Sequence, residues 1–228
     1  YGLPKTSWIF ELGFEKVIAK IICFLQFVIF FSILKILKLI YYYIMGKSIV
    51  FVNQKGGVGK TTSAINIGAY IAMAGKKVLL VDFDSQGNMS SGVGISKDKP
   101  TVYELLAGQV EAKDAVKKTP VPNLDAISAS IDLSGAAIEL VDQEEREFFL
   151  KEALAPLKEQ YDYILIDCPP SLGILTVNGL AAADSVLVPM QCEYFALEGI
   201  TLLLQTVQKV QKEINPNLTI GGIFFTMY

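Results

Sequence analysis

The 228-residue sequence predicts an α/β protein with a doubly wound, mostly parallel sheet and helices on both of its faces. Three observations support this fold class. Short apolar runs rich in β-branched residues alternate with longer stretches of helical periodicity, as in βαβ units. A glycine-rich turn joins the first of these runs to the first helical stretch. Two later apolar runs lead directly into aspartates, and α/β sheets bind their ligands at the carboxyl ends of parallel strands.

The composition narrows the possible chemistry. Hydrophobic residues make up 52% of the chain, which suffices for one α/β domain with a sizeable core and a short extension. The absence of histidine excludes Ser-His-Asp, Cys-His and histidine-metal mechanisms. Cys23, Cys168 and Cys192 lie far apart and form no CxxC pair, so they predict neither a disulfide framework nor a metal site. Lysines, carboxylates, hydroxyls and backbone groups remain available.

The first part of the chain differs from the rest. Residues 1–44 form an apolar N-terminal extension, and residues 45–228 form the predicted domain. Within the extension, residues 17–34 are almost continuously apolar and are followed by Lys35 and Lys38, a pattern typical of a membrane anchor with that end in the cytoplasm. The alternative is a gene-start artefact, because the Ile, Phe, Leu, Lys and Tyr bias is that of translated AT-rich non-coding DNA.

The glycine-rich turn predicts a phosphate-binding loop. It lies between an apolar strand at residues 48–52 and a helix at residues 61–74. Its glycines let backbone N–H groups approach an anion, and the helix adds the positive end of its dipole. We expect Lys60 to reach the β- and γ-phosphates of ATP and Thr61 to supply a hydroxyl ligand for Mg²⁺. The predicted ATP-binding residues are Lys55, Gly56, Gly57, Val58, Gly59, Lys60, Thr61 and Thr62.

This loop departs from the ordinary P-loop pattern. Gln54 stands where the first glycine is usual, and a second lysine, Lys55, follows it. The run Lys-Gly-Gly-Val-Gly-Lys-Thr-Thr resembles the deviant Walker A box of the ParA/MinD superfamily. The resemblance implies a P-loop NTPase fold and a homodimer that forms on ATP binding, with Lys55 carried across the interface to the partner's nucleotide.

The next strand, expected at residues 77–81, leads into a second acidic segment. Residues 81–88 resemble the family's second acidic box, which implies that Asp84 positions or polarises the attacking water. We expect Asp82 to help order the Mg²⁺ shell. The alternative is that the two carboxylates only cap the turn after the strand.

The middle of the chain shows a less regular pattern, up to an apolar strand that ends in an aspartate. We expect surface loops and short helices at residues 90–122, a weak strand at residues 123–128 and a largely helical segment at residues 134–160. The apolar strand at residues 161–167 is typical of a Walker B element. Asp167 at its end is expected to hold Mg²⁺ through water.

The last part of the chain predicts a strand at residues 185–189, a helix ending near residue 212 and a strand at residues 218–225. Residues 191–199 resemble the ParA/Soj partition branch in particular. The resemblance covers residues 45–228, where Met45 matches an ordinary start, and the usual C-terminal end of the domain is missing.

The resemblance implies a slow, partner-stimulated Mg²⁺-ATP hydrolase that acts in chromosome or plasmid partitioning, with Lys55, Lys60 and Asp84 as catalytic groups. The implied partners are a ParB-like centromere-binding protein and non-specific DNA, and the implied location is the cytoplasm, at the nucleoid. Residues 46–228 carry 15 basic and 21 acidic side chains, so no overall basic footprint for DNA is visible.

Three alternatives remain open at this point. A membrane-anchored P-loop tyrosine kinase would combine a spanning segment with the same boxes, its ATPase-like domain facing the cytoplasm from the inner membrane. A MinD-like positioning ATPase would carry a C-terminal amphipathic helix. A nucleotide switch without hydrolysis would share the same sequence features.

Overall fold

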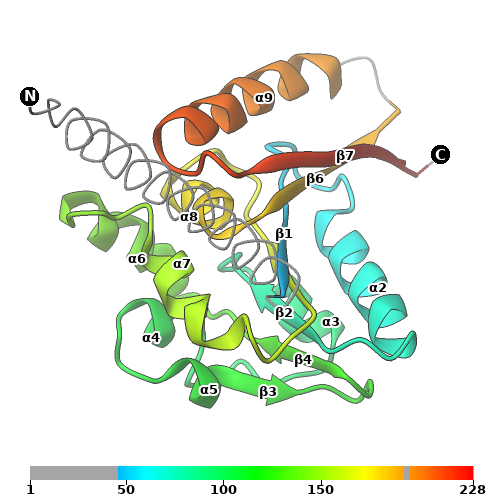
Figure 1. Ribbon diagram of the computed structural model, residues 1–228, viewed down its shortest axis with the longest axis vertical. Coiled ribbons are helices and arrows are strands. Elements are labelled where there is room, and N and C mark those ends of the chain that lie inside the picture. The colour runs from blue at the N-terminus through cyan, green and yellow to red at the C-terminus, as the bar shows by residue number, and fades with distance from the viewer. Residues whose placement is uncertain (1–45, 193–195, 228) are drawn as a thin grey trace, which may run out of the picture. The chain divides into compact units, whose positions relative to one another are not determined.

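The computed structural model describes residues 46–192 and 196–227, and its centre is a seven-stranded sheet of order β3-β4-β2-β5-β1-β6-β7 (Figure 1). All neighbouring strands are parallel except β3, which runs antiparallel to β4. This arrangement confirms the predicted fold class. The strands are β1 (Lys47–Phe51), β2 (Val78–Asp82), β3 (Val116–Lys118), β4 (Leu124–Ile127), β5 (Tyr163–Asp167), β6 (Ser185–Gln191) and β7 (Thr219–Thr226).

Helices cover both faces of the sheet (Figure 1). Helices α2 and α3 pack on one face, while α4, α6, α7, α8 and α9 pack on the other. The helices are α2 (Lys60–Met73), α3 (Asn88–Gly92), α4 (Val102–Leu106), α5 (Ala112–Ala115), α6 (Leu133–Glu139), α7 (Phe149–Leu154), α8 (Ile174–Ala182) and α9 (Ala196–Glu213). Short 3-10 turns, Leu140–Asp142 and Ala155–Leu157, follow α6 and α7.

The predicted N-terminal extension, residues 1–44, lies outside the described residues, so the membrane-anchor and artefact hypotheses are not tested. Within the ranges that the structure describes, no helix combines the length and apolarity needed to cross a bilayer.

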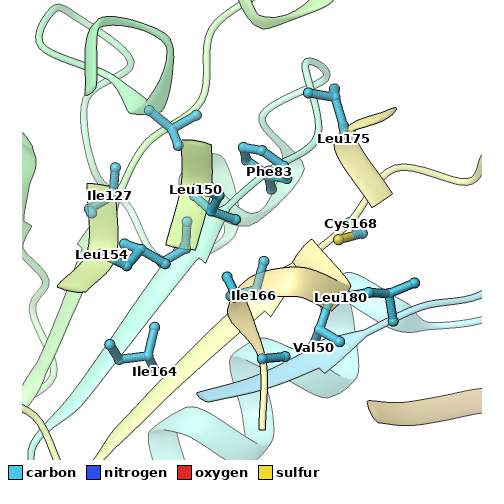
Figure 2. Close-up of a cluster of buried hydrophobic side chains, with 14 of the residues drawn as sticks. Val50, Phe83, Ile127, Leu150, Leu154, Ile164, Ile166, Cys168, Leu175 and Leu180 are labelled. Carbon is cyan, nitrogen blue, oxygen red and sulfur yellow. The ribbon is translucent and has the colours of Figure 1, made fainter. Parts of the chain in front are cut away.

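The central strands are buried on both faces, which explains their continuous apolar runs. Figure 2 shows the larger core, in which Val50, Ile164 and Ile166 of the sheet lie near Leu154 of α7 and Leu180 of α8. This packing fixes the position and direction of the central strands, whose carboxyl ends form the candidate site.

The smaller core depends on a close approach of α2 to the sheet. A Cβ atom at Gly68 would lie 2.8 Å from Leu80 Cδ2 and 3.2 Å from Leu165 Cδ1. Glycine therefore lets the helix settle directly on β2 and β5. The helix that follows the glycine-rich loop is held rigidly on the sheet.

The segment at residues 134–160 is largely helical, as predicted, but the sequence did not predict the break within it. Helix α6 ends at Glu139, and irregular backbone at residues 143–148 separates it from α7. The buried Asn178 of α8 stabilises this break, because its Nδ2 donates to Arg146 O at 2.7 Å and its Oδ1 accepts from Leu150 N at 3.1 Å. The Asn178 side chain, which lies 28 to 32 residues further along the chain, thus supplies hydrogen bonds that a continuous helix would have made within itself.

The sequence also did not predict the edge strand β3, which lies in a charged stretch. Its lysines are held by β4 and the residue after it: Lys118 Nζ lies 2.8 Å from Asp125 Oδ2, and Lys117 Nζ donates to Ser128 Oγ at 2.8 Å. Lysines on an edge strand also discourage pairing with another chain.

Helix α4 begins with a buried capping box. Glu104 Oε2 accepts hydrogen bonds from Thr101 N at 2.9 Å and Thr101 Oγ1 at 2.7 Å, and Lys99 Nζ lies 2.8 Å from Glu104 Oε1. Burial alone would raise the pKa of Glu104, but the bonds from Lys99 and Thr101 outweigh it and lower the pKa to about 2. The ionised carboxylate is therefore the form that stabilises this turn.

We predict that Glu104→Gln lowers the free energy of unfolding at pH 7 by about 1 to 2 kcal/mol, because the folded pKa lies below its unfolded value and solvent screens the exposed Lys99 partner. The wild-type advantage is full above the unfolded pKa of about 4.5 and is lost as the pH falls toward about 2. Urea denaturation across this pH range measures it. The exposed Glu111→Gln serves as control and should match wild type, and a difference that does not shrink with falling pH would contradict the assignment.

Candidate active site

The carboxyl ends of three adjacent strands bring the predicted site residues together. In the register of the sheet, Phe51 of β1 and Asp82 of β2 both lie beside Asp167 of β5. The glycine-rich loop leaves β1 at this same edge. The loop and both acidic segments therefore meet at one end of the sheet, as the sequence predicted.

The loop has the conformation of an anion cradle. Gly57 and Gly59 have φ angles of 73° and 84°, the left-handed region that glycine adopts without strain. A Cβ atom at Gly56 or Gly57 would meet nothing within 4 Å, so this part of the loop is open. Helix α2 begins directly after Gly59 and directs the positive end of its dipole at the loop.

Lys60 is buried beneath the loop. Its ammonium group donates to Lys55 O at 3.4 Å, and the residue is only 7% exposed. Burial lowers the pKa of Lys60, while the charges of Asp167 and Asp84 act in the opposite direction. The lysine is thus placed between the loop and both acidic segments, where a phosphate chain would find it.

Asp167 and Thr61 form a pair suited to a metal ion. The Thr61 hydroxyl donates a hydrogen bond to the buried Asp167 carboxylate. Burial raises the pKa of Asp167 to about 7; Thr61 and Lys60 oppose this rise, whereas Asp82 and Asp84 add to it. Asp167 Oδ1 has no hydrogen-bond partner among the described residues. A buried carboxylate oxygen without a partner, next to a hydroxyl, matches the hard oxygen donors that Mg²⁺ prefers.

Protein groups alone would not complete a metal shell here. In the described part of the chain, no group of three or more His, Cys, Asp and Glu side chains is arranged to hold a metal. Mg²⁺ commonly uses one or two carboxylates together with water and substrate phosphates. The donor set therefore fits a metal that arrives with a phosphate-bearing ligand.

Asp82 is engaged by the protein itself. Its Oδ2 accepts hydrogen bonds from Ser90 N at 2.7 Å and Ser90 Oγ at 2.6 Å, and its Oδ1 accepts from Asp84 N at 3.4 Å. Burial raises its pKa against these bonds. Ser90 Oγ also accepts from Ala129 N at 3.1 Å, so Asp82 links β2, α3 and the segment after β4. These contacts hold the segment after β2 in place. The role of Asp82 toward a metal ion stays a prediction.

Asp84 lies in the turn after β2 and is half-buried. Its Oδ1 accepts from Gln86 N at 3.1 Å, and its backbone carbonyl accepts from Gly87 N at 2.9 Å. The turn therefore holds the carboxylate near Lys60 while leaving it partly accessible. Its predicted role toward water is compatible with this position and stays a prediction.

Lys55 lies on the exposed side of the loop. Its N–H donates to Asn53 Oδ1 at 3.0 Å, and Asn53 Nδ2 donates to Pro189 O at 2.8 Å. The backbone of Lys55 is thus fixed by β6, while its side chain lies where a second subunit could reach it.

Two supporting residues were not predicted from the sequence. Asn53, at the end of the first apolar run, carries a weak signal as a polar residue next to a strand, whereas Ser90 carries none. Cys168 is buried in the larger core, and burial raises the pKa of its thiol.

Comparison with known proteins links this site to a group of nucleotide-dependent proteins. A family model described as an AAA domain matches residues 46–220. The chain is 69% identical over 184 residues to the chromosome-partitioning ATPase Soj of Treponema pallidum, an alignment that covers 81% of this chain and 72% of the relative.

Solved structures agree with this comparison. Cobyrinic acid a,c-diamide synthase from Mycobacterium smegmatis, with bound ADP and magnesium, superposes with a TM-score of 0.78 at 45% identity over 81% of this chain and 76% of that one. A plasmid partition protein from Borrelia burgdorferi superposes with a TM-score of 0.72 at 33% identity, covering 81% and 80%.

We predict that Lys60→Ala weakens ATP binding by about 10- to 100-fold, because it removes a buried cation that would make charge-assisted bonds to phosphate. Isothermal titration calorimetry with Mg²⁺-ATP measures the effect. The matched control is Lys76→Ala, which removes an exposed lysine paired with Asp162 at 3.6 Å and should leave the affinity unchanged. Equal affinities for the two variants would show that Lys60 does not contact the nucleotide.

Proposed function

Because the chain belongs to the Soj/ParA family of chromosome-partitioning ATPases, we propose that it binds Mg²⁺-ATP at this sheet edge, dimerises on it and hydrolyses it slowly. In this proposal the hydrolytic cycle serves chromosome or plasmid partitioning with a ParB-like protein and non-specific DNA. The observation that carries the nucleotide site is the convergence of Lys60, Thr61 and Asp167 beside an open glycine loop.

The phosphate chain would lie in the loop. Backbone N–H groups from residues 55–62 bind its oxygens, and Lys60 neutralises charge at the β- and γ-phosphates. Thr61 and Asp167 would hold Mg²⁺, which neutralises charge that develops on the transferred phosphoryl group. Asp82 keeps the segment after β2 in place through Ser90, so that the second acidic segment faces the loop.

Asp84 is the proposed group that orients water. Two features support this role. The carboxylate is partly exposed, and it lies close enough to Lys60 for its negative charge to raise the pKa of that lysine. A carboxylate in this position accepts a hydrogen bond from water and directs its oxygen toward phosphorus.

Lys55 is the proposed group that acts on a neighbouring subunit. Lys60 already serves the cradle from within, and the Lys55 side chain lies on the exposed side of the loop. A cation brought across an interface stabilises charge only when two loops face each other, as arginine fingers do. ATP would then bridge the two subunits and drive their association.

The partition role is favoured over the alternative functions by the relatives. The Treponema relative is named as a chromosome-partitioning ATPase, and the Borrelia neighbour as a plasmid partition protein. These names support a ParB-like partner, DNA binding and a place at the nucleoid in the cytoplasm as parts of the proposal. They give no support to a membrane-anchored tyrosine kinase or a MinD-like positioning ATPase.

We predict that Asp84→Ala separates binding from hydrolysis. ATP affinity should stay within about twofold of wild type, since the loop is intact, while the turnover rate should fall by about 100-fold or more. Phosphate release at saturating ATP measures turnover, and Asp114→Ala, an exposed carboxylate on α5, is the control. Turnover at the wild-type rate would move the role in orienting water to another carboxylate, with Asp82 next.

We predict that Lys55→Gln binds ATP as a monomer and loses both dimerisation and hydrolysis, because the charge acts on the partner's phosphates. Multi-angle light scattering with and without Mg²⁺-ATP tests this. Lys113→Gln, an exposed lysine paired with Glu111 at 2.7 Å, should dimerise like wild type. If Lys55→Gln formed dimers as stable as those of wild type, the cross-subunit mechanism would fail.

A further inference from the structure

Two carbonyl groups of the glycine-rich loop accept hydrogen bonds from side chains at the far end of the chain. Gln191 Nε2 donates to Gly57 O at 3.1 Å, and Thr226 Oγ1 lies 2.8 Å from Val58 O. Gln191 ends β6, Thr226 ends β7, and the two residues are partners in the register of the sheet. Both contacts join segments more than 130 residues apart.

Thr226 also contacts the strand that carries Gln191. Thr226 Oγ1 lies 3.3 Å from Met190 O, so the hydroxyl is held between β6 and the loop. The Thr226 methyl group faces Gly59, where an added Cβ atom would lie 3.5 Å from Thr226 Cγ2. A hydrogen bond thus joins the loop to the end of β7, and a side chain at Gly59 would press against Thr226.

Peptide geometry gives these contacts a consequence for anion binding. In a trans peptide, the carbonyl of one residue and the N–H of the next point in opposite directions. A carbonyl of Gly57 held toward Gln191 therefore turns the N–H of Val58 away from β6, and a carbonyl of Val58 held toward Thr226 does the same for Gly59. These N–H groups belong to the cradle that would receive phosphate.

We propose that Gln191 and Thr226 are positioning residues that hold the loop in its anion-binding conformation before ATP arrives. They do so through the loop backbone and contact no phosphate themselves. Pre-organisation of this kind raises affinity by reducing the ordering that binding requires. The proposal rests on the ATP-binding part of the proposed function and is independent of dimerisation and DNA.

The test uses substitutions that remove the hydroxyl but keep the shape. Thr226→Val should weaken binding of a fluorescent ATP analogue with Mg²⁺ by about three- to tenfold, the range expected for one hydrogen bond. Thr226→Ser, which retains the hydroxyl, should restore most of the affinity. Thr219→Val is the matched control, because Thr219 Oγ1 donates to Asp184 O at 3.0 Å at the opposite end of the same strand.

Thermal denaturation without nucleotide separates this role from a general effect on stability. Thr226→Val and Thr219→Val should then melt alike, while only Thr226→Val binds ATP more weakly. Gln191→Met provides a second variant, which loses the donor to Gly57 and should show the same loss. Wild-type affinity in both Thr226→Val and Gln191→Met would overturn this inference alone, whereas a wild-type protein that failed to bind ATP would also overturn the proposed function.

Discussion

The hydrogen-bond register of the three central parallel strands is the constraint on which the site depends. It sets Phe51, Asp82 and Asp167 side by side at the carboxyl edge of the sheet. A shift by one residue would turn the Asp167 side chain to the opposite face, away from Thr61. The two apolar cores hold this register, because β1, β2 and β5 are packed between helices on both faces. The geometry of the candidate site is thus a consequence of core packing.

Burial at this edge creates an electrostatic arrangement that favours a cation and an anion together. Lys60, Asp82 and Asp167 are all nearly inaccessible to water. Burial lowers the pKa of Lys60 and raises the pKa values of Asp82 and Asp167, so it favours the neutral form of each side chain. Asp82 offsets part of this cost with bonds to Ser90, whereas one oxygen of Asp167 has no hydrogen-bond partner within the residues that the structure describes. A metal ion next to Asp167 and phosphate next to Lys60 would relieve the remaining imbalance.

The glycine-rich loop is supported from two directions. Helix α2 fixes its outgoing end, because Gly68 allows the helix to lie directly on Leu80 and Leu165. The ends of β6 and β7 fix its middle through Gln191 and Thr226. These contacts support the proposal that the glycine-rich loop is ordered before an anion arrives, which would reduce the ordering cost of binding.

The sequence by itself determined the fold class, the approximate strands and the elements that carry Lys60, Asp84 and Asp167, because each follows from a local pattern: apolar periodicity, a glycine motif or an aspartate after an apolar run. Only the tertiary structure decided the edge strand β3, the break before α7 and the supporting contacts of Ser90, Gln191 and Thr226. The physical reason is the same for each: they depend on partners that lie far away along the chain or outside the residue's own segment, and local periodicity does not encode such pairs.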